Sequence, residues 1–142
     1  MSMSYVDKCF RKVLLLFSEV KEEIDKEHPH KTILALWAII ELFLRALVYR
    51  YKRATYDRPG KLISVFSRSI LPLIRVKEDI VLKINVLYDL RKRAAHRPDI
   101  MGSKELEKAW RLFCQIIDFL LRELKRMFPK VEDILKYAKR YC

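Results

Sequence analysis

The sequence contains few glycines and few amide side chains: two glycines, one asparagine (Asn85) and one glutamine (Gln115) in 142 residues. Lys and Arg together number 30, and Asp and Glu together number 18. Scarce amides combined with many charged side chains are typical of proteins from hyperthermophiles, in which thermolabile residues are depleted. We therefore expect a thermostable protein from a thermophile.

Cysteine is also scarce, and its spacing excludes a structural zinc site. Cys9, Cys114 and Cys142 lie far apart, and the sequence has no Cys-x2-Cys pair. Cys9 and Cys114 lie among apolar residues, so we expect both to be buried thiols, whereas Cys142 could form a disulfide between subunits. His28 and His30 alone, two candidate ligands in a predicted turn, are too few to indicate a metal site, so we predict no metal and no other cofactor.

No segment has the pattern of a secretory signal or a membrane anchor. Residues 1–5 lack a basic region followed by an apolar block. The most apolar run, 32–49, is short for a transmembrane helix, and it carries Glu41 and Arg45, whose charges are costly inside a bilayer. We predict that this run is a buried helix, that no membrane is involved and that the protein is cytoplasmic.

The charge balance points to a negatively charged partner. The net charge is +12 at pH 7 and the isoelectric point is near 9.8. Such a charge favours binding to nucleic acid first and to an anionic membrane surface second. The alternative is that the excess of lysine serves only solubility.

Apolar residues recur at helical spacing along nearly the whole chain, which predicts an all-α fold. No repeat, low-complexity stretch or linker divides the chain, so we expect one domain over 1–142. Four long helices with short additions predict an up-and-down four-helix bundle. Ser103 is the expected N-cap of the last long helix. The predicted helices cover residues 4–26, 31–53, 61–70, 76–95, 104–127 and 129–140.

One basic segment, 90–98, follows an apolar helical stretch and has the side chains that phosphodiester cleavage requires. His96 can move a proton near neutral pH, and Arg91 can hold phosphate oxygens with its planar guanidinium. The alternative is a chance pairing, since a basic protein places an Arg near a His somewhere. On a regular helix at roughly 100° per residue, positions 91 and 96 lie about 140° apart, so the two side chains do not converge easily within one chain.

The order of these helices and the Arg-x4-His motif resemble the HEPN superfamily, the small all-α domain of many prokaryotic ribonuclease toxins and defence nucleases. The resemblance covers about residues 4–128, with Arg91 and His96 at the positions of the defining motif. Glu41 and Arg45 match a Glu-x3-Lys/Arg pair that some HEPN families add as supporting residues, and they equally fit a plain ion pair within a helix.

Two positions depart from the pattern of the family. Lys92 follows the motif arginine, where Asn, Asp, Ser or His is common, and Pro98 stands where one toxin subclass has a tyrosine. The absence of that tyrosine puts toxin–antitoxin regulation through its modification in doubt. A nucleotidyltransferase-type antitoxin is still a possible partner by resemblance.

The resemblance implies metal-independent cleavage of RNA by a homodimer, with the two motifs facing each other in one composite site. The ribose 2′-hydroxyl would attack the adjacent phosphorus, His96 would move the proton, and Arg91 would stabilise the charged transition state. The basic residues around the motif, Lys92, Arg93 and Arg97, are expected to bind RNA phosphates. Two alternatives are an inactive RNA-binding module and a structural partner of another enzyme.

Overall fold

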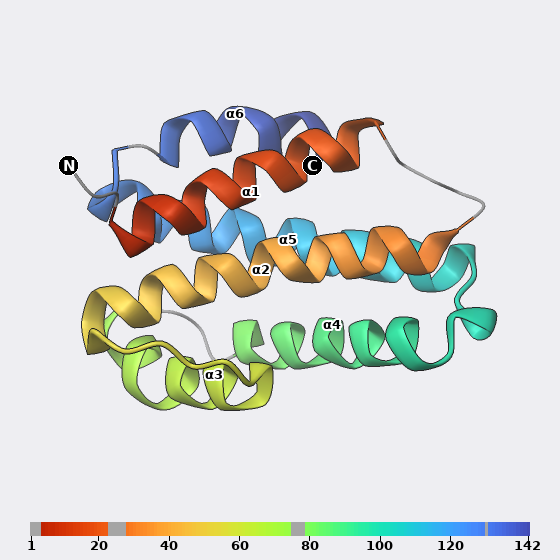
Figure 1. The fold of residues 1–142 in the computed structure, drawn as a ribbon, viewed down its shortest axis with the longest axis horizontal. Coiled ribbons are helices and arrows are strands. Elements are labelled where there is room, and N and C mark those ends of the chain that lie inside the picture. Colours follow the sequence, from red (N-terminus) through yellow and green to blue (C-terminus); the bar gives the residue numbers. More distant parts are fainter. Residues whose placement is uncertain (1–3, 23–27, 75–78, 130) are drawn as a thin grey trace.

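The computed structural model describes residues 4–22, 28–74, 79–129 and 131–142, and within these ranges the chain is helical and contains no strand (Figure 1). The predicted all-α class is therefore confirmed. The helices are α1 (Tyr5–Glu22), α2 (Pro29–Lys52), α3 (Pro59–Val65), α4 (Asp79–His96), α5 (Ser103–Met127) and α6 (Val131–Tyr141).

The observed helix boundaries lie within a few residues of the predicted ones. The short helix α3 continues as a π-helical turn (Phe66–Ile70) and a 3-10 turn (Leu71–Leu73), and another 3-10 turn (Pro98–Ile100) links α4 to α5. The predicted end of the first helix at residue 26 and the predicted start of the fourth at residue 76 lie outside the described residues.

Helix α2 is the centre of the bundle. It packs against α1, α4 and α5 and also contacts α3, and successive long helices run in opposite directions (Figure 1). Because α2 is apolar on most sides, it needs neighbours on most sides to cover it. Its length and composition would also suit a membrane span, but 61% of its most apolar window is buried inside the protein.

Local sequence explains where α2 begins and ends. Pro29 occupies the first helical position, where its fixed φ suits a helix and its missing N–H is not needed. At the other end Arg53 adopts a left-handed conformation (φ 54°), and its N–H donates to the carbonyl of Tyr49 at 2.9 Å. A left-handed residue stops a helix because the chain then turns away from the helix axis.

The start of α5 corrects one prediction. The N-cap is Gly102 and not Ser103, which is the first helical residue. The side chain of Glu105 takes over the capping role, since its carboxylate accepts the Gly102 N–H at 3.0 Å. The backbone N–H groups of Glu105 itself and of Gly102 hold the pKa of this carboxyl below its usual value.

The cysteines show a second correction. Cys9 is a buried thiol, as predicted, but Cys114 and Cys142 form a disulfide within the chain. The expectation of a free Cys114 is therefore wrong, and Cys142, for which a disulfide between subunits was an open alternative, pairs within its own chain. The reason is topological: α5 extends about 20 Å beyond Cys114, and α6 returns about 16 Å along it, which brings the end of the chain back beside Cys114.

The disulfide is expected to stabilise the fold by restricting the unfolded chain. For a sequence separation of 28 residues, the loop-entropy relation gives about 3 to 4 kcal/mol. We predict that Cys142→Ser lowers the free energy of unfolding by about this amount in chemical denaturation. Addition of a reductant should destabilise the natural protein to the same level and leave the variant unchanged. Equal stability of the natural protein and the variant, both measured without reductant, would contradict this account.

Candidate functional site

The end of α4 exposes His96. The histidine is the last residue of the helix, and the N–H of Arg97 still donates to the carbonyl of Arg93. Pro98 follows, and the helix cannot continue because proline disfavours helical conformation at the residue before it. Among the described residues none hydrogen-bonds to the His96 imidazole, so this group is open to solvent and to ligands.

Basic side chains surround His96 in a shallow pocket of about 500 Å³, which we call the α4 pocket. Four of its lining residues lie on one face of α4, because positions 92 and 93 follow position 89 by three and four residues and precede position 96 by four and three. The structure thus brings all three predicted RNA-binding residues together with His96. The residues lining the α4 pocket are Asp89, Lys92, Arg93, His96 and Arg97.

Arg91 is not part of this pocket. Its side chain is half-buried on another side of α4, as the angle of about 140° from His96 requires. The two residues of the Arg-x4-His motif are therefore not brought together within one chain. Two cations of α4 share a face of the helix with His96: Lys92, four residues before it, and Arg93, three residues before it.

Two of the cations in the α4 pocket already have partners. Lys92 forms an ion pair with Asp89 at 3.1 Å, and its ammonium group lies 4.7 Å from the centre of the Tyr88 ring. Arg97 donates two hydrogen bonds to Asp99, at 3.2 and 3.1 Å. These hydrogen bonds hold the pKa of the Asp99 carboxyl below its usual value and raise the pKa of Arg97.

Arg93 differs from these two. Within the part of the chain that the structure describes, it forms no ion pair, although its charge helps to lower the pKa of Glu105. A guanidinium without an ion pair beside an exposed imidazole can hold an anion through planar, charge-assisted hydrogen bonds. Sequence reasoning treated Lys92, Arg93 and Arg97 alike, because their partners become visible only in three dimensions.

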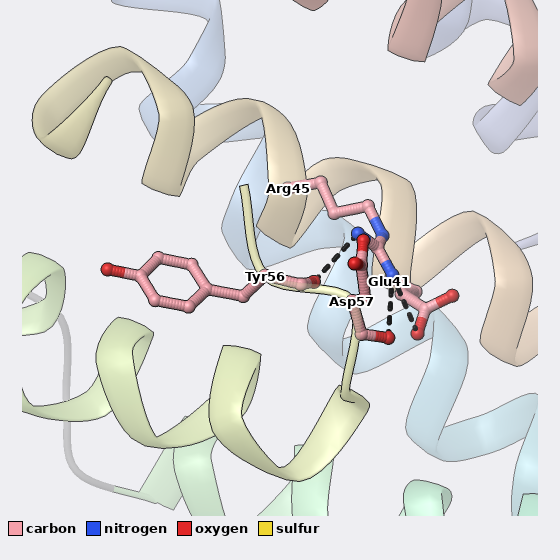
Figure 2. Close-up of polar contacts among 4 residues, drawn as sticks. All are labelled: Glu41, Arg45, Tyr56 and Asp57. Atoms are coloured by element: carbon pink, nitrogen blue, oxygen red, sulfur yellow. Dashed lines mark hydrogen bonds and ion pairs between the residues drawn. The ribbon is translucent and has the colours of Figure 1, made fainter. Parts of the chain in front are cut away.

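Glu41 and Arg45 lie elsewhere. They form an ion pair at 3.7 Å on α2, as the spacing of four residues predicted. Figure 2 shows that the Arg45 guanidinium also donates to the backbone carbonyls of Tyr56 and Asp57, at 2.7 and 3.3 Å. Arg45 therefore fixes the loop between α2 and α3, a structural role that its sequence spacing gave no sign of.

Glu41 and Arg45 line a second pocket, of about 680 Å³, which we call the α1–α2 groove. It shares no residue with the α4 pocket. Its other side is formed by residues of α1: Cys9, and residues that the sequence analysis did not single out, among them Tyr5, Lys8 and Lys12. Burial raises the pKa of both the Tyr5 hydroxyl and the Cys9 thiol, so neither is ionised near neutral pH.

The described residues contain no group of three or more His, Cys, Asp or Glu side chains that could hold a metal ion. Comparison with known proteins gave no match to the chain among family models, curated proteins or solved structures. The likeness to HEPN domains therefore depends on the helix order, on Arg91 and His96, and on the Glu41–Arg45 pair.

The contacts of Arg45 make its structural role testable. We predict that Arg45→Met lowers the free energy of unfolding by about 2 kcal/mol, because two carbonyls lose a charged hydrogen-bond donor. Glu41→Gln should cost less than about 0.5 kcal/mol, since it removes only a long ion pair. Denaturant unfolding of both variants measures the difference. An Arg45→Met protein of normal stability would show instead that Arg45 does not hold the loop.

Proposed function

We propose that this protein is a metal-independent endoribonuclease that acts as a homodimer, in the manner of HEPN domains. The observation that carries the proposal is the exposed His96 at the end of α4, in a pocket lined by Lys92, Arg93 and Arg97. An imidazole without an internal partner beside several cations suits proton transfer on a bound phosphodiester. The net charge of +12 supplies the long-range attraction for RNA.

The proposed reaction needs only the RNA and protein side chains. The ribose 2′-hydroxyl loses its proton to one imidazole and attacks the neighbouring phosphorus. The bond from phosphorus to the 5′-oxygen of the next nucleotide breaks, and a second imidazole gives that oxygen a proton. The products are a 2′,3′-cyclic phosphate and a 5′-hydroxyl. DNA lacks the attacking hydroxyl and is not cut.

The second imidazole and a converging Arg91 come from the partner chain in this proposal. Within one chain Arg91 does not line the α4 pocket, so the motif is incomplete there. A two-fold axis beside α4 would bring two copies of the same surface face to face. Arg91 of one chain would then hold the phosphate oxygens while His96 of the other moves the proton.

A second function, RNA binding without cleavage, is favoured by the same placement of Arg91. If the chains do not pair, the α4 pocket has one histidine and a set of phosphate-binding cations, which suits an RNA-binding module.

We also propose that the protein is cytoplasmic. An intracellular protein with the Cys114–Cys142 disulfide and few amides fits a hyperthermophile, in which disulfides are common inside the cell.

His96 is the most direct target for mutation. We predict that His96→Ala lowers RNA cleavage by about 10²-fold or more, because the proton-transfer group is lost. The exposed position should keep the stability within about 0.5 kcal/mol of the natural protein. Cleavage of a single-stranded RNA in the presence of a chelator measures the effect. Undiminished cleavage by the variant would remove His96 from the mechanism and leave the binding module as the better function.

Mixing natural and inactive chains tests whether the site is shared between chains. Arg91→Lys should also lower turnover by orders of magnitude, since Lys keeps the charge but loses the planar fork. We predict that natural chains, unfolded and refolded with an excess of His96→Ala chains, lose most of their activity, because a mixed dimer has only one of the two imidazoles that the reaction uses. Activity that stays proportional to the amount of natural chain would contradict a site built from two chains.

The Arg97–Asp99 pair yields a prediction on binding alone. We expect Asp99→Asn to raise RNA affinity by about three- to tenfold at low salt and to steepen the salt dependence, because Arg97 becomes free to bind a phosphate. Lowering the pH through the depressed pKa of Asp99 should act in the same direction, since protonation breaks the pair. The matched control is Asp118→Asn, which frees Arg122 on α5, outside the α4 pocket. Equal gains in both variants would mean that net charge alone governs binding.

A further inference from the structure

The α1–α2 groove has the size and the walls of a small-molecule site. Its volume of about 680 Å³ lies within the range of ligand pockets, roughly 300 to 1,000 Å³. Tyr5 and the buried Cys9 lie on its α1 side, and the Arg45 guanidinium, fixed by its carbonyl partners, lies on its α2 side (Figure 2). The groove runs between α1 and α2, whereas α4 packs on the opposite side of α2 (Figure 1).

One wall of the groove carries unbalanced positive charge. Lys8, Arg11 and Lys12 are exposed neighbours on one face of α1, and all of them line the groove. Like charges three or four residues apart repel each other and weaken a helix. In the described ranges these cations form no ion pair, whereas other exposed cations do, for example Arg122 with Asp118. An anion bound in the groove would relieve this repulsion.

The opposite wall carries carboxylates. Glu41 and Asp57 line the groove from α2 and from the loop that Arg45 holds. Only Oε1 of Glu41 faces Arg45, at 3.7 Å, and Figure 2 shows its other oxygen without a partner among the residues drawn. A carboxylate with a free oxygen can accept hydrogen bonds from the hydroxyl groups of a ribose.

From this arrangement we propose that the α1–α2 groove binds a ribonucleoside 5′-phosphate, either free or as the 5′ end of an RNA. The phosphate lies against Lys8, Arg11 and Lys12, and the ribose hydroxyls donate to Glu41. Tyr5, whose ring packs against Tyr49 with the centroids 4.6 Å apart, also lines the groove and would lie near the base. An inorganic anion would use the basic wall only, so the carboxylate wall distinguishes a nucleotide from phosphate. The proposal does not depend on RNA cleavage at the α4 pocket.

Calorimetric titration with adenosine 5′-monophosphate tests the proposal. We expect saturable binding, about tenfold weaker binding for each lysine replaced in the Lys8→Gln/Lys12→Gln variant, and little change in a Lys104→Gln/Lys108→Gln control. The control removes the same charge at the same spacing from exposed positions of α5. Equally weakened binding in both variants would show general electrostatic attraction and overturn the proposal, as would an absence of binding.

Further probes identify the ligand and its source. The 2′-deoxy analogue and inorganic phosphate should both bind more weakly than the ribonucleotide, and Glu41→Gln should abolish the preference for ribose. Equal affinity for inorganic phosphate would overturn the nucleotide assignment. A 5′-phosphorylated RNA oligonucleotide that competes better than its 5′-hydroxyl form would identify an RNA end as the source, and a mononucleotide that competes better than both would identify a free nucleotide.

Magnetic resonance shows whether the nucleotide occupies this groove. Bound nucleotide should shift the backbone amide signals of Lys8, Arg11 and Lys12 in the natural protein, and the shift at Arg11 should be lost in the Lys8→Gln/Lys12→Gln variant. Signals that change only outside the residues lining the groove at saturating nucleotide would place the ligand elsewhere. His96→Ala should leave all of these measurements unaltered, which separates failure of this site from failure of the proposed ribonuclease activity.

Discussion

The burial of α2 is the constraint on which the rest of the structure depends. Its apolar side chains cover most of the helix surface, so α1, α4 and α5 must pack around it and α3 must cover part of its end. The packing leaves the Thr32 hydroxyl and the Trp37 indole N–H buried without a hydrogen-bond partner among the described residues, a local cost that the surrounding apolar contacts offset. On the part of α2 that reaches the surface, Arg45 donates hydrogen bonds to the loop between α2 and α3 and holds it in place.

Both pockets follow from this arrangement. Because α4 must lie along α2, its last turn projects His96 and its basic neighbours past the end of the apolar contact, where proline stops the helix. Because α1 lies along another side of α2, its exposed lysines stand beside the polar segment of α2 and form the groove. The two sites thus lie on different sides of one central helix and can be altered independently.

Much of the fold could be predicted from the sequence, since the apolar stripes and the prolines mark the helices to within a few residues. Contacts between residues that are far apart in the sequence could not be predicted, because they depend on how the chain folds back on itself. The Cys114–Cys142 disulfide requires knowing that α6 folds back along α5 by a matching length. The Arg45 contacts go to backbone carbonyls, which carry no residue-type signal. At Gly102 the side chain of Glu105 made a capping serine unnecessary.

The candidate site was predictable in part. The proximity of Lys92 and Arg93 to His96 follows from helical spacing, and so does the separation of Arg91, whereas Arg97 is the next residue in the chain. The spacing does not show which cations form ion pairs, because Asp89 pairs with Lys92 and Asp99 pairs with Arg97 through side-chain geometry. The incomplete motif within one chain is the structural reason for proposing a second copy at this surface.

Chemical analysis of the cleaved RNA ends tests the central claim most directly. We predict that purified protein in excess chelator leaves 2′,3′-cyclic phosphate and 5′-hydroxyl ends, identified by mass spectrometry, and that a single 2′-deoxy substitution blocks cleavage at its own linkage only. The His96→Ala protein purified in parallel should leave the RNA intact. Ends bearing a 5′-phosphate, or cleavage at the deoxy-substituted linkage, would contradict attack by the 2′-hydroxyl and with it the proposed mechanism.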